Sequence, residues 1–171
     1  FRAWLATHPV KPFPGTLQLL RQLRQAGLRT ALFSASRNAP AVLASARLSE
    51  SFDVVLDGTE LARRGLPGKP DPAMLLETAS ALGIAPRAAA VIEDAAAGVK
   101  SAVAGGFGLV IGVDRHGDGE YLRAAGASVV VGDLAELRLT SERTLAVKTL
   151  ATLPSAWDHA EAIRARLTGR R

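Results

Sequence analysis

Short apolar runs separated by segments of helical length are the feature that most restricts the fold of this sequence. The runs cover Leu28–Phe33, Phe52–Leu56, Ala89–Glu93, Leu109–Val113 and Ser128–Val131. The apolar residues in these runs are mostly consecutive rather than alternating, which indicates strands that are buried on both faces. Such strands, alternating with helices, are typical of an α/β fold. We therefore expect a three-layer, Rossmann-like parallel sheet with helices on both sides.

The segments between these runs have the lengths and end signals of helices. Helices are predicted from Thr16 to about Ala26 and over Ala39–Ala46, Pro72–Leu82, Ala95–Ala104 and Gly119–Ala125. Thr16 and Asn38 are the expected N-caps of the first two. The strand-helix pattern spans residues 12–137, which we interpret as one core. Residues 138–171 are expected to form a linker and, from Pro154, an amphipathic C-terminal helix.

Composition argues against several classes of partner. The chain has 171 residues, a net charge of +5 and no cysteine. Without cysteine it has no disulfide or thiolate metal site, which suits a reducing compartment, so a cytoplasmic location is expected. No apolar run approaches the ~20 residues that a membrane span requires, so no membrane partner is expected. The arginines are scattered and aromatic residues are few, which argues against a nucleic-acid partner.

Polar side chains follow three of the predicted strands. Ser34 follows the first apolar run, Lys69 lies in a proline-rich loop after the second, and Glu93 and Asp94 close the third. Ligands bind outside the carboxyl ends of the strands in an open α/β sheet, so these side chains are expected to converge. Each also has a simpler interpretation: Ser34 as a turn cap, Lys69 as a solvated loop residue, and Asp94 as a helix cap.

Together these groups suit a phosphoryl group and a divalent cation. The Ser34 hydroxyl can donate to a phosphoryl oxygen beside a helix N-terminus. The Lys69 ammonium can neutralise such an oxygen and keep a carboxylate nucleophile ionised. Adjacent carboxylates repel each other unless a cation compensates, and Mg²⁺ binds one or two carboxylates together with water and phosphate oxygens. Glu93 and Asp94 are therefore the candidate Mg²⁺ ligands.

The order of these residues resembles that of the haloacid dehalogenase-like superfamily. Over residues 12–137, Ser34 matches the second motif of these phosphotransferases, Lys69 the third, and Glu93 with Asp94 the fourth. The resemblance implies a Mg²⁺-dependent phosphatase or sugar-phosphate mutase in which Ser34 and Lys69 are catalytic. The implied substrate is a small phosphorylated molecule, a sugar phosphate.

The run Ser34-Ala35-Ser36-Arg37-Asn38 is also similar to a loop of the β-phosphoglucomutases. In that family the Ser, basic and Asn positions hold the second phosphate of the sugar. The resemblance therefore implies that Ser36, Arg37 and Asn38 bind a distal substrate phosphate.

One part of the superfamily pattern is missing. Its nucleophile is an Asp in D-x-D-x-T or D-x-D-x-V on the first strand, which lies between the strands that correspond to 28–33 and 89–93. No such motif occurs in the 171 residues. We expect an upstream segment to supply this central strand, its nucleophile and most of a cap domain, with residues 1–11 as the end of the cap or of a preceding helical segment. The chain alone is predicted to be inactive.

The tail has a second resemblance. Leu153–Trp157 and the residues that follow are similar to the segment before the phosphatase domain of some bacterial trehalose-phosphate phosphatases. This similarity implies that residues 138–171 lead to a further domain. It also raises an alternative function, a non-catalytic companion domain of a multidomain trehalose-phosphate phosphatase. The presence of all three motifs favours the enzyme, because a purely structural domain does not need Lys69, Glu93 and Asp94 together.

Overall fold

The helices and strands alternate along most of the chain, as the sequence predicts. The computed structural model describes residues 1–139 and 145–147. The strands are β1 (Ala31–Phe33), β2 (Val54–Leu56), β3 (Ala90–Glu93), β4 (Leu109–Val113), β5 (Val129–Val131), β6 (Leu137–Leu139) and β7 (Leu145–Val147). The helices are α1 (Arg2–Thr7), α2 (Pro14–Gln25), α3 (Ala39–Ser45), α4 (Gly58–Arg63), α5 (Ala73–Ala81), α6 (Ala96–Ala104) and α7 (Gly119–Ala124), with 3-10 turns η1 (Pro86–Ala88) and η2 (Leu134–Glu136).

Parallel strand pairing confirms the predicted α/β class. β1 pairs with β2, and β3, β4 and β5 form a second parallel sheet in that order. Each predicted strand is present; β4 has the same bounds as its apolar run, and the other four are shorter than theirs. β1 begins later than its apolar run because the Asp53 carboxylate accepts the Thr30 N–H at 2.7 Å, so that this N–H does not bond to a neighbouring strand.

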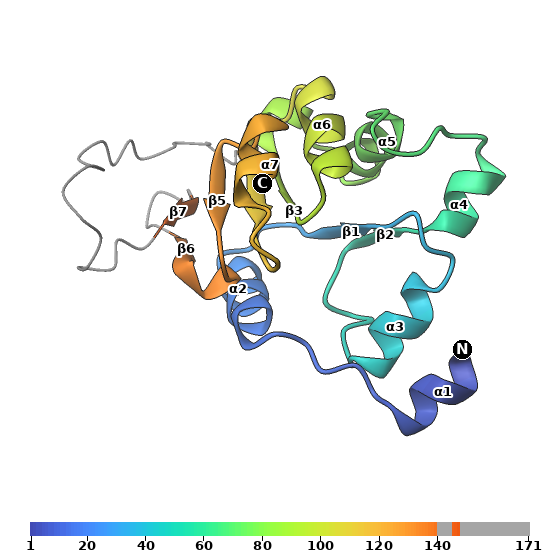
Figure 1. Cartoon of the computed structure of the whole chain (residues 1–171). Helices are drawn as coiled ribbons and strands as arrows, with labels where there is room; N and C mark the ends of the chain where they lie inside the picture. The colour runs from blue at the N-terminus through green and yellow to red at the C-terminus, as the bar shows by residue number, and fades with distance from the viewer. Residues whose placement is uncertain (140–144, 148–171) are drawn as a thin grey trace.

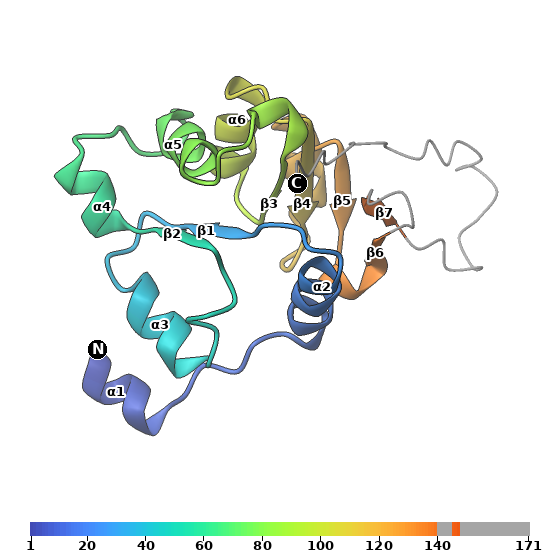
Figure 2. The same cartoon turned by 180° about the vertical axis from the view of Figure 1, so that it is seen from behind.

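Helices cover both faces of the β3-β4-β5 sheet (Figures 1 and 2). On one face, the buried core joins strand residues to α5, α6 and α7 and contains Leu75, Val91, Val99, Ala102, Val110, Leu122 and Ala125. On the other face it joins the strands to α2 and η2 and contains Leu19, Leu109, Ile111, Val113, Val131, Leu134 and Leu137. Consecutive β4 residues thus enter opposite cores, which is why the run is apolar throughout.

A slot separates the two parallel sheets. β1 and β3 are not paired with each other, yet eight consecutive residues from each segment, 28–35 and 88–95, line one cavity of about 610 Å³. Lys69 contacts the carboxyl ends of both strands, since it pairs with Glu93 and lies over the Phe33 ring. The expectation that a strand is missing between β1 and β3 agrees with this arrangement.

Some local expectations were wrong. Helix α2 begins at Pro14 with Phe13 as its N-cap, so Thr16 lies inside the helix. The proline at the first helical position needs no N–H partner, which makes the earlier start favourable. Asn38 does occupy the N-cap position of α3, but its side chain makes no capping hydrogen bond.

Helix α4 and the strands β6 and β7 were not expected from the sequence. Helix α4 lies in a segment interpreted as a loop, and its signal was the sequence Asp57-Gly58-Thr59-Glu60, where the Asp57 carboxylate caps the N–H groups of Thr59 and Glu60. Strands β6 and β7 form an antiparallel pair in the segment expected to be a linker. The helix predicted from Pro154 lies outside the described residues. Within the described ranges, no helix has the length and apolar character needed to cross a membrane.

Candidate active site

Lys69 contacts both sides of the slot, at the carboxyl ends of β1 and β3. Its ammonium forms an ion pair with the Glu93 carboxylate and lies 4.5 Å from the centre of the Phe33 ring. The Lys69 side chain is 21% exposed and that of Glu93 is 6% exposed. Lys69 is therefore a fixed, partly buried charge rather than the solvated loop residue of the simpler interpretation.

Glu93 is held from several directions. One carboxylate oxygen pairs with Lys69, and the other accepts the N–H groups of Asp94 at 3.1 Å and Ala95 at 3.2 Å. Gly98, in the next helix, leaves the space that this side chain fills, because a Cβ there would overlap the Glu93 carboxylate. Because Gly98 has no side chain, α6 leaves room for the buried Glu93 at the end of β3.

Asp94 differs from its neighbour. It is exposed, and among the described residues its carboxylate makes no hydrogen bond or ion pair. It does not cap α6, whose N-cap is Ala95 without a side-chain capping bond. The interpretation of Asp94 as a helix cap is therefore wrong, and its oxygens remain available to a ligand at the carboxyl edge of the sheet.

Ser34 begins a tightly bonded loop after β1. Its N–H donates to the Leu56 carbonyl at 2.9 Å, which extends the pairing with β2 by one residue. Its hydroxyl accepts the Ser36 N–H at 3.2 Å, and the Ser36 hydroxyl accepts the Asn38 N–H at 3.1 Å. These bonds leave the hydroxyl proton of each serine free to donate to a ligand.

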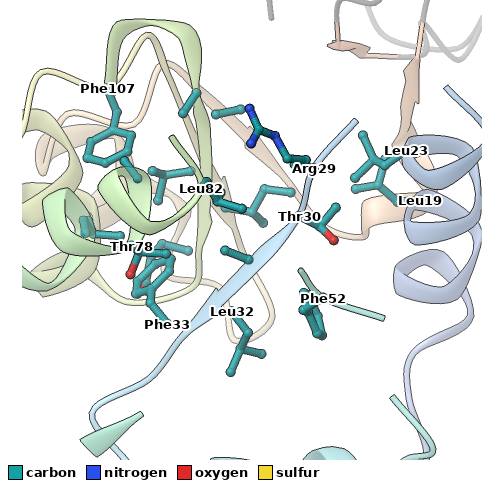
Figure 3. Close-up of a pocket in the computed structure, with 18 of the residues that line it drawn as sticks. Leu19, Leu23, Arg29, Thr30, Leu32, Phe33, Phe52, Thr78, Leu82 and Phe107 are labelled. Atoms are coloured by element: carbon teal, nitrogen blue, oxygen red, sulfur yellow. The ribbon is translucent and has the colours of Figure 1, made fainter. Parts of the chain in front are cut away.

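The four expected catalytic and metal residues meet at one end of the cavity, which is lined by Ser34, Lys69, Glu93 and Asp94. Ser36, Arg37 and Asn38 do not line it but follow directly in the exposed loop. Figure 3 shows the cavity's interior, where Leu19 and Leu23 of α2 lie on one side of β1 and Thr78 and Leu82 on the other. Most residues that line the cavity are apolar; the charged ones are Arg29, before β1, and Lys69, Glu93, Asp94 and Arg115, at or after the carboxyl ends of the strands.

Arg115 also lines the cavity and was not predicted from the sequence as a site residue. It follows β4, and its guanidinium lies 3.7 Å from the centre of the Phe13 ring. The turn that holds it is fixed by Asp114, whose carboxylate accepts four backbone N–H groups, from His116 to Gly119. The signal was the Asp-Arg pair directly after an apolar strand, at the same edge as Asp94.

The comparisons with known proteins define the class. Residues 2–106 match the family of haloacid dehalogenase-like hydrolases, and the chain belongs to that family. It is 42% identical over 128 residues to a beta-phosphoglucomutase of Mycobacterium bovis, covering 73% of this chain and 49% of that protein. It is 36% identical over 149 residues to a trehalose-phosphate phosphatase of Mycobacterium leprae, covering 81% of this chain and 33% of that protein.

A solved structure supports the same assignment. The protein CbbY of Rhodobacter sphaeroides, in complex with xylulose-(1,5)bisphosphate, superposes with a TM-score of 0.66 at 27% identity, covering 80% of this chain and 60% of that one. The chain spans about half or less of the length of the curated relatives named above. It is thus a haloacid dehalogenase-like α/β domain, similar to β-phosphoglucomutases and to part of a trehalose-phosphate phosphatase.

Proposed function

We propose that this chain forms the phosphate- and metal-binding part of a Mg²⁺-dependent phosphoryl-transfer site for a sugar phosphate, as a phosphatase or phosphomutase. The observation that carries the proposal is the convergence of Ser34, Lys69, Glu93 and Asp94 at one end of the slot between β1 and β3. Phosphoryl transfer depends on positioning and charge neutralisation, and these are the functions such groups supply.

Each residue has a distinct proposed role. The Ser34 hydroxyl donates to an oxygen of the transferred phosphoryl group. The Lys69 ammonium neutralises charge on that group. When no substrate is bound, its ion pair with Glu93 keeps the ammonium directed toward the site. Ser34 and Lys69 are thus the proposed catalytic residues of this chain.

The carboxylates fit a magnesium ion. Asp94 offers exposed oxygens without a partner among the described residues, and the Glu93 oxygens retain lone pairs beyond those used by Lys69 and the backbone. Within the described ranges, no group of three or more His, Cys, Asp or Glu side chains could hold a metal ion, but Mg²⁺ requires only one or two protein carboxylates. When bound, the ion would offset the charge of the phosphoryl oxygens.

The nucleophile is proposed to come from a strand outside residues 1–171. The slot has unpaired strand edges on both sides and apolar walls from α2 and α5, which suit a parallel apolar strand. The carboxyl end of such a strand would lie beside Lys69, where an Asp side chain would be kept ionised by the ammonium. That Asp would attack phosphorus while the bond from phosphorus to the sugar oxygen breaks and the sugar oxygen leaves as a hydroxyl, with a proton from solvent; water or a sugar hydroxyl would later take the phosphoryl group from the Asp and release its carboxylate.

The proposal of a sugar-phosphate substrate is based on the loop after β1. Ser36, Arg37 and Asn38 are exposed and adjacent to the catalytic Ser34. Arginine suits bidentate phosphate binding, and Arg37 makes no ion pair with any residue that the structure describes. The named relatives support the same class, since one is a sugar-phosphate mutase by name and CbbY holds a sugar bisphosphate. The alternative, a non-catalytic companion domain, is not favoured.

The test uses a completed protein, defined as a chimera in which this chain replaces the matched residues of the Mycobacterium bovis relative. We expect it to release or transfer phosphate from sugar phosphates in the presence of Mg²⁺ and to lose turnover in EDTA. The control is the 171-residue chain alone, which is expected to be inactive. Turnover by the pure chain alone, or none by a folded chimera on any sugar phosphate, would contradict the proposal.

A further inference from the structure

The turn after β2 packs directly against the Ser34–Asn38 loop. The Gly58 N–H donates to the Ser36 carbonyl at 3.2 Å. A Cβ on Gly58 would overlap the Ala35 carbonyl oxygen and would lie 2.8 Å from the Ala35 carbonyl carbon and 3.0 Å from the Arg37 nitrogen. All three are backbone atoms, so no side-chain rotation would relieve the overlap.

Hydrogen bonds fix the backbone on both sides of this contact. Gly58 is buried in the first turn of α4, where the Asp57 carboxylate accepts the N–H groups of Thr59 and Glu60 at 3.0 Å each. Gly58 does not have a positive φ, so its role is to leave space and not to allow an unusual backbone conformation. On the other side, Ser34 and Ser36 hold the loop through their hydroxyls.

We propose that Gly58 is a positioning residue for the distal-phosphate loop. Its missing Cβ lets the start of α4 pack against the backbone that carries Ser36, Arg37 and Asn38. An added methyl group would force the loop away from α4 and would displace Arg37. Misplacement of a binding group by about 1 Å costs up to ~100-fold in rate, so the loss should fall on substrates that use this loop.

This inference rests on the proposed function, since it assigns the loop to a second phosphate. The experiment compares Gly58→Ala, Arg37→Ala and the control Gly132→Ala in the completed protein. Gly132 follows β5, has no positive φ, and its added Cβ would only reach the Glu136 side chain at 3.4 Å. Two substrates are used: a sugar bisphosphate and p-nitrophenyl phosphate, which has no distal phosphate.

We expect Gly58→Ala to lower kcat/KM for the sugar bisphosphate by about 10- to 100-fold and to leave kcat/KM for p-nitrophenyl phosphate nearly unchanged. Arg37→Ala should show the same selectivity, and Gly132→Ala should show neither change. The amide NMR resonances of Ser36, Arg37 and Asn38 should shift in Gly58→Ala and not in Gly132→Ala.

The outcomes separate the two proposals. If Arg37→Ala affects both substrates equally or neither, the loop does not bind a distal phosphate and the substrate assignment fails. If Arg37→Ala is selective but Gly58→Ala is not, the positioning role is wrong. Unshifted loop resonances in Gly58→Ala would overturn that role even in a protein without turnover.

Discussion

Lys69, from the loop that follows α4, forms an ion pair with Glu93 at the end of β3 and lies over the ring of Phe33 at the end of β1. β1 and β3 belong to different sheets, so one side chain contacts the carboxyl ends of two strands that are not themselves paired. The charge is thereby placed where a strand filling the slot would end.

Replacing Lys69 should impair both chemistry and stability. In the completed protein, Lys69→Ala should lower kcat by about 100-fold or more, by analogy with the loss of a preorganised donor. Lys69→Ala leaves the buried Glu93 carboxylate with only its two backbone N–H donors, so the thermal midpoint should also fall. Steady-state kinetics and thermal unfolding measure the two effects. A near-normal kcat in a folded variant would show that Lys69 does not stabilise the transferred group.

Asp94 should be required for the metal. Asp94→Asn should abolish Mg²⁺-dependent turnover of the completed protein, because the exposed carboxylate is the charge available to the ion. The matched control is Asp118→Asn, another exposed aspartate whose side chain makes no capping bond in its helix. Titration calorimetry with Mg²⁺ gives a second readout. Equal Mg²⁺ affinity in Asp94→Asn and the parent protein would remove Asp94 from the metal site.

Gly98 should be needed for the buried position of Glu93. A Cβ at residue 98 would overlap the Glu93 carboxylate, so Gly98→Ala should displace that carboxylate from Lys69 and from the backbone N–H groups. Overpacking of this kind typically costs about 1–3 kcal/mol. Urea unfolding of the completed protein measures the loss, with Gly132→Ala as the control. An unchanged midpoint would mean that α6 or Glu93 adapts without cost.

The Asp114 turn should make stability depend on pH. Desolvation raises the pKa of this carboxyl, but the N–H donors of Asp118, Gly117, His116 and Gly119 outweigh it, so the pKa lies below its ordinary 3.8. Because the folded pKa is depressed, the stabilisation is present above pH 3.8 and is lost as the pH falls below it. Asp114→Asn should therefore lower the thermal midpoint at pH 7, and the difference from the parent should shrink at acidic pH. A difference that is constant with pH would contradict this origin.

The sequence was sufficient for the fold class and for the placement of Ser34, Glu93 and Asp94 at one sheet edge, because the continuous apolar strands that precede them are parallel. It was not sufficient for contacts that depend on three-dimensional packing. Lys69 pairs with Glu93, which is 24 residues away in the sequence. Gly58 contacts the loop at Ser36, which is also distant in the sequence. No local sequence pattern indicates either contact. Helix α4 was missed because it is only six residues long and depends on its Asp57 cap.

The slot between β1 and β3 should accept a strand supplied as a separate peptide. The residues that line it, 28–35 and 88–95, give it room for about eight extended residues. Unpaired buried backbone groups cost ~1–3 kcal/mol each, so the 171-residue chain alone should be aggregation-prone and should bind a hydrophobic dye. A peptide of about eight residues, apolar throughout and ending in Asp, should reduce dye binding and protect the amides of β1 and β3 from hydrogen exchange. The matched control is a peptide with lysine at every second position, because both faces of the slot are apolar and an alternating strand would bury charges. Equal protection of β1 and β3 without any peptide, or equal binding of the alternating peptide, would show that the slot does not receive a strand.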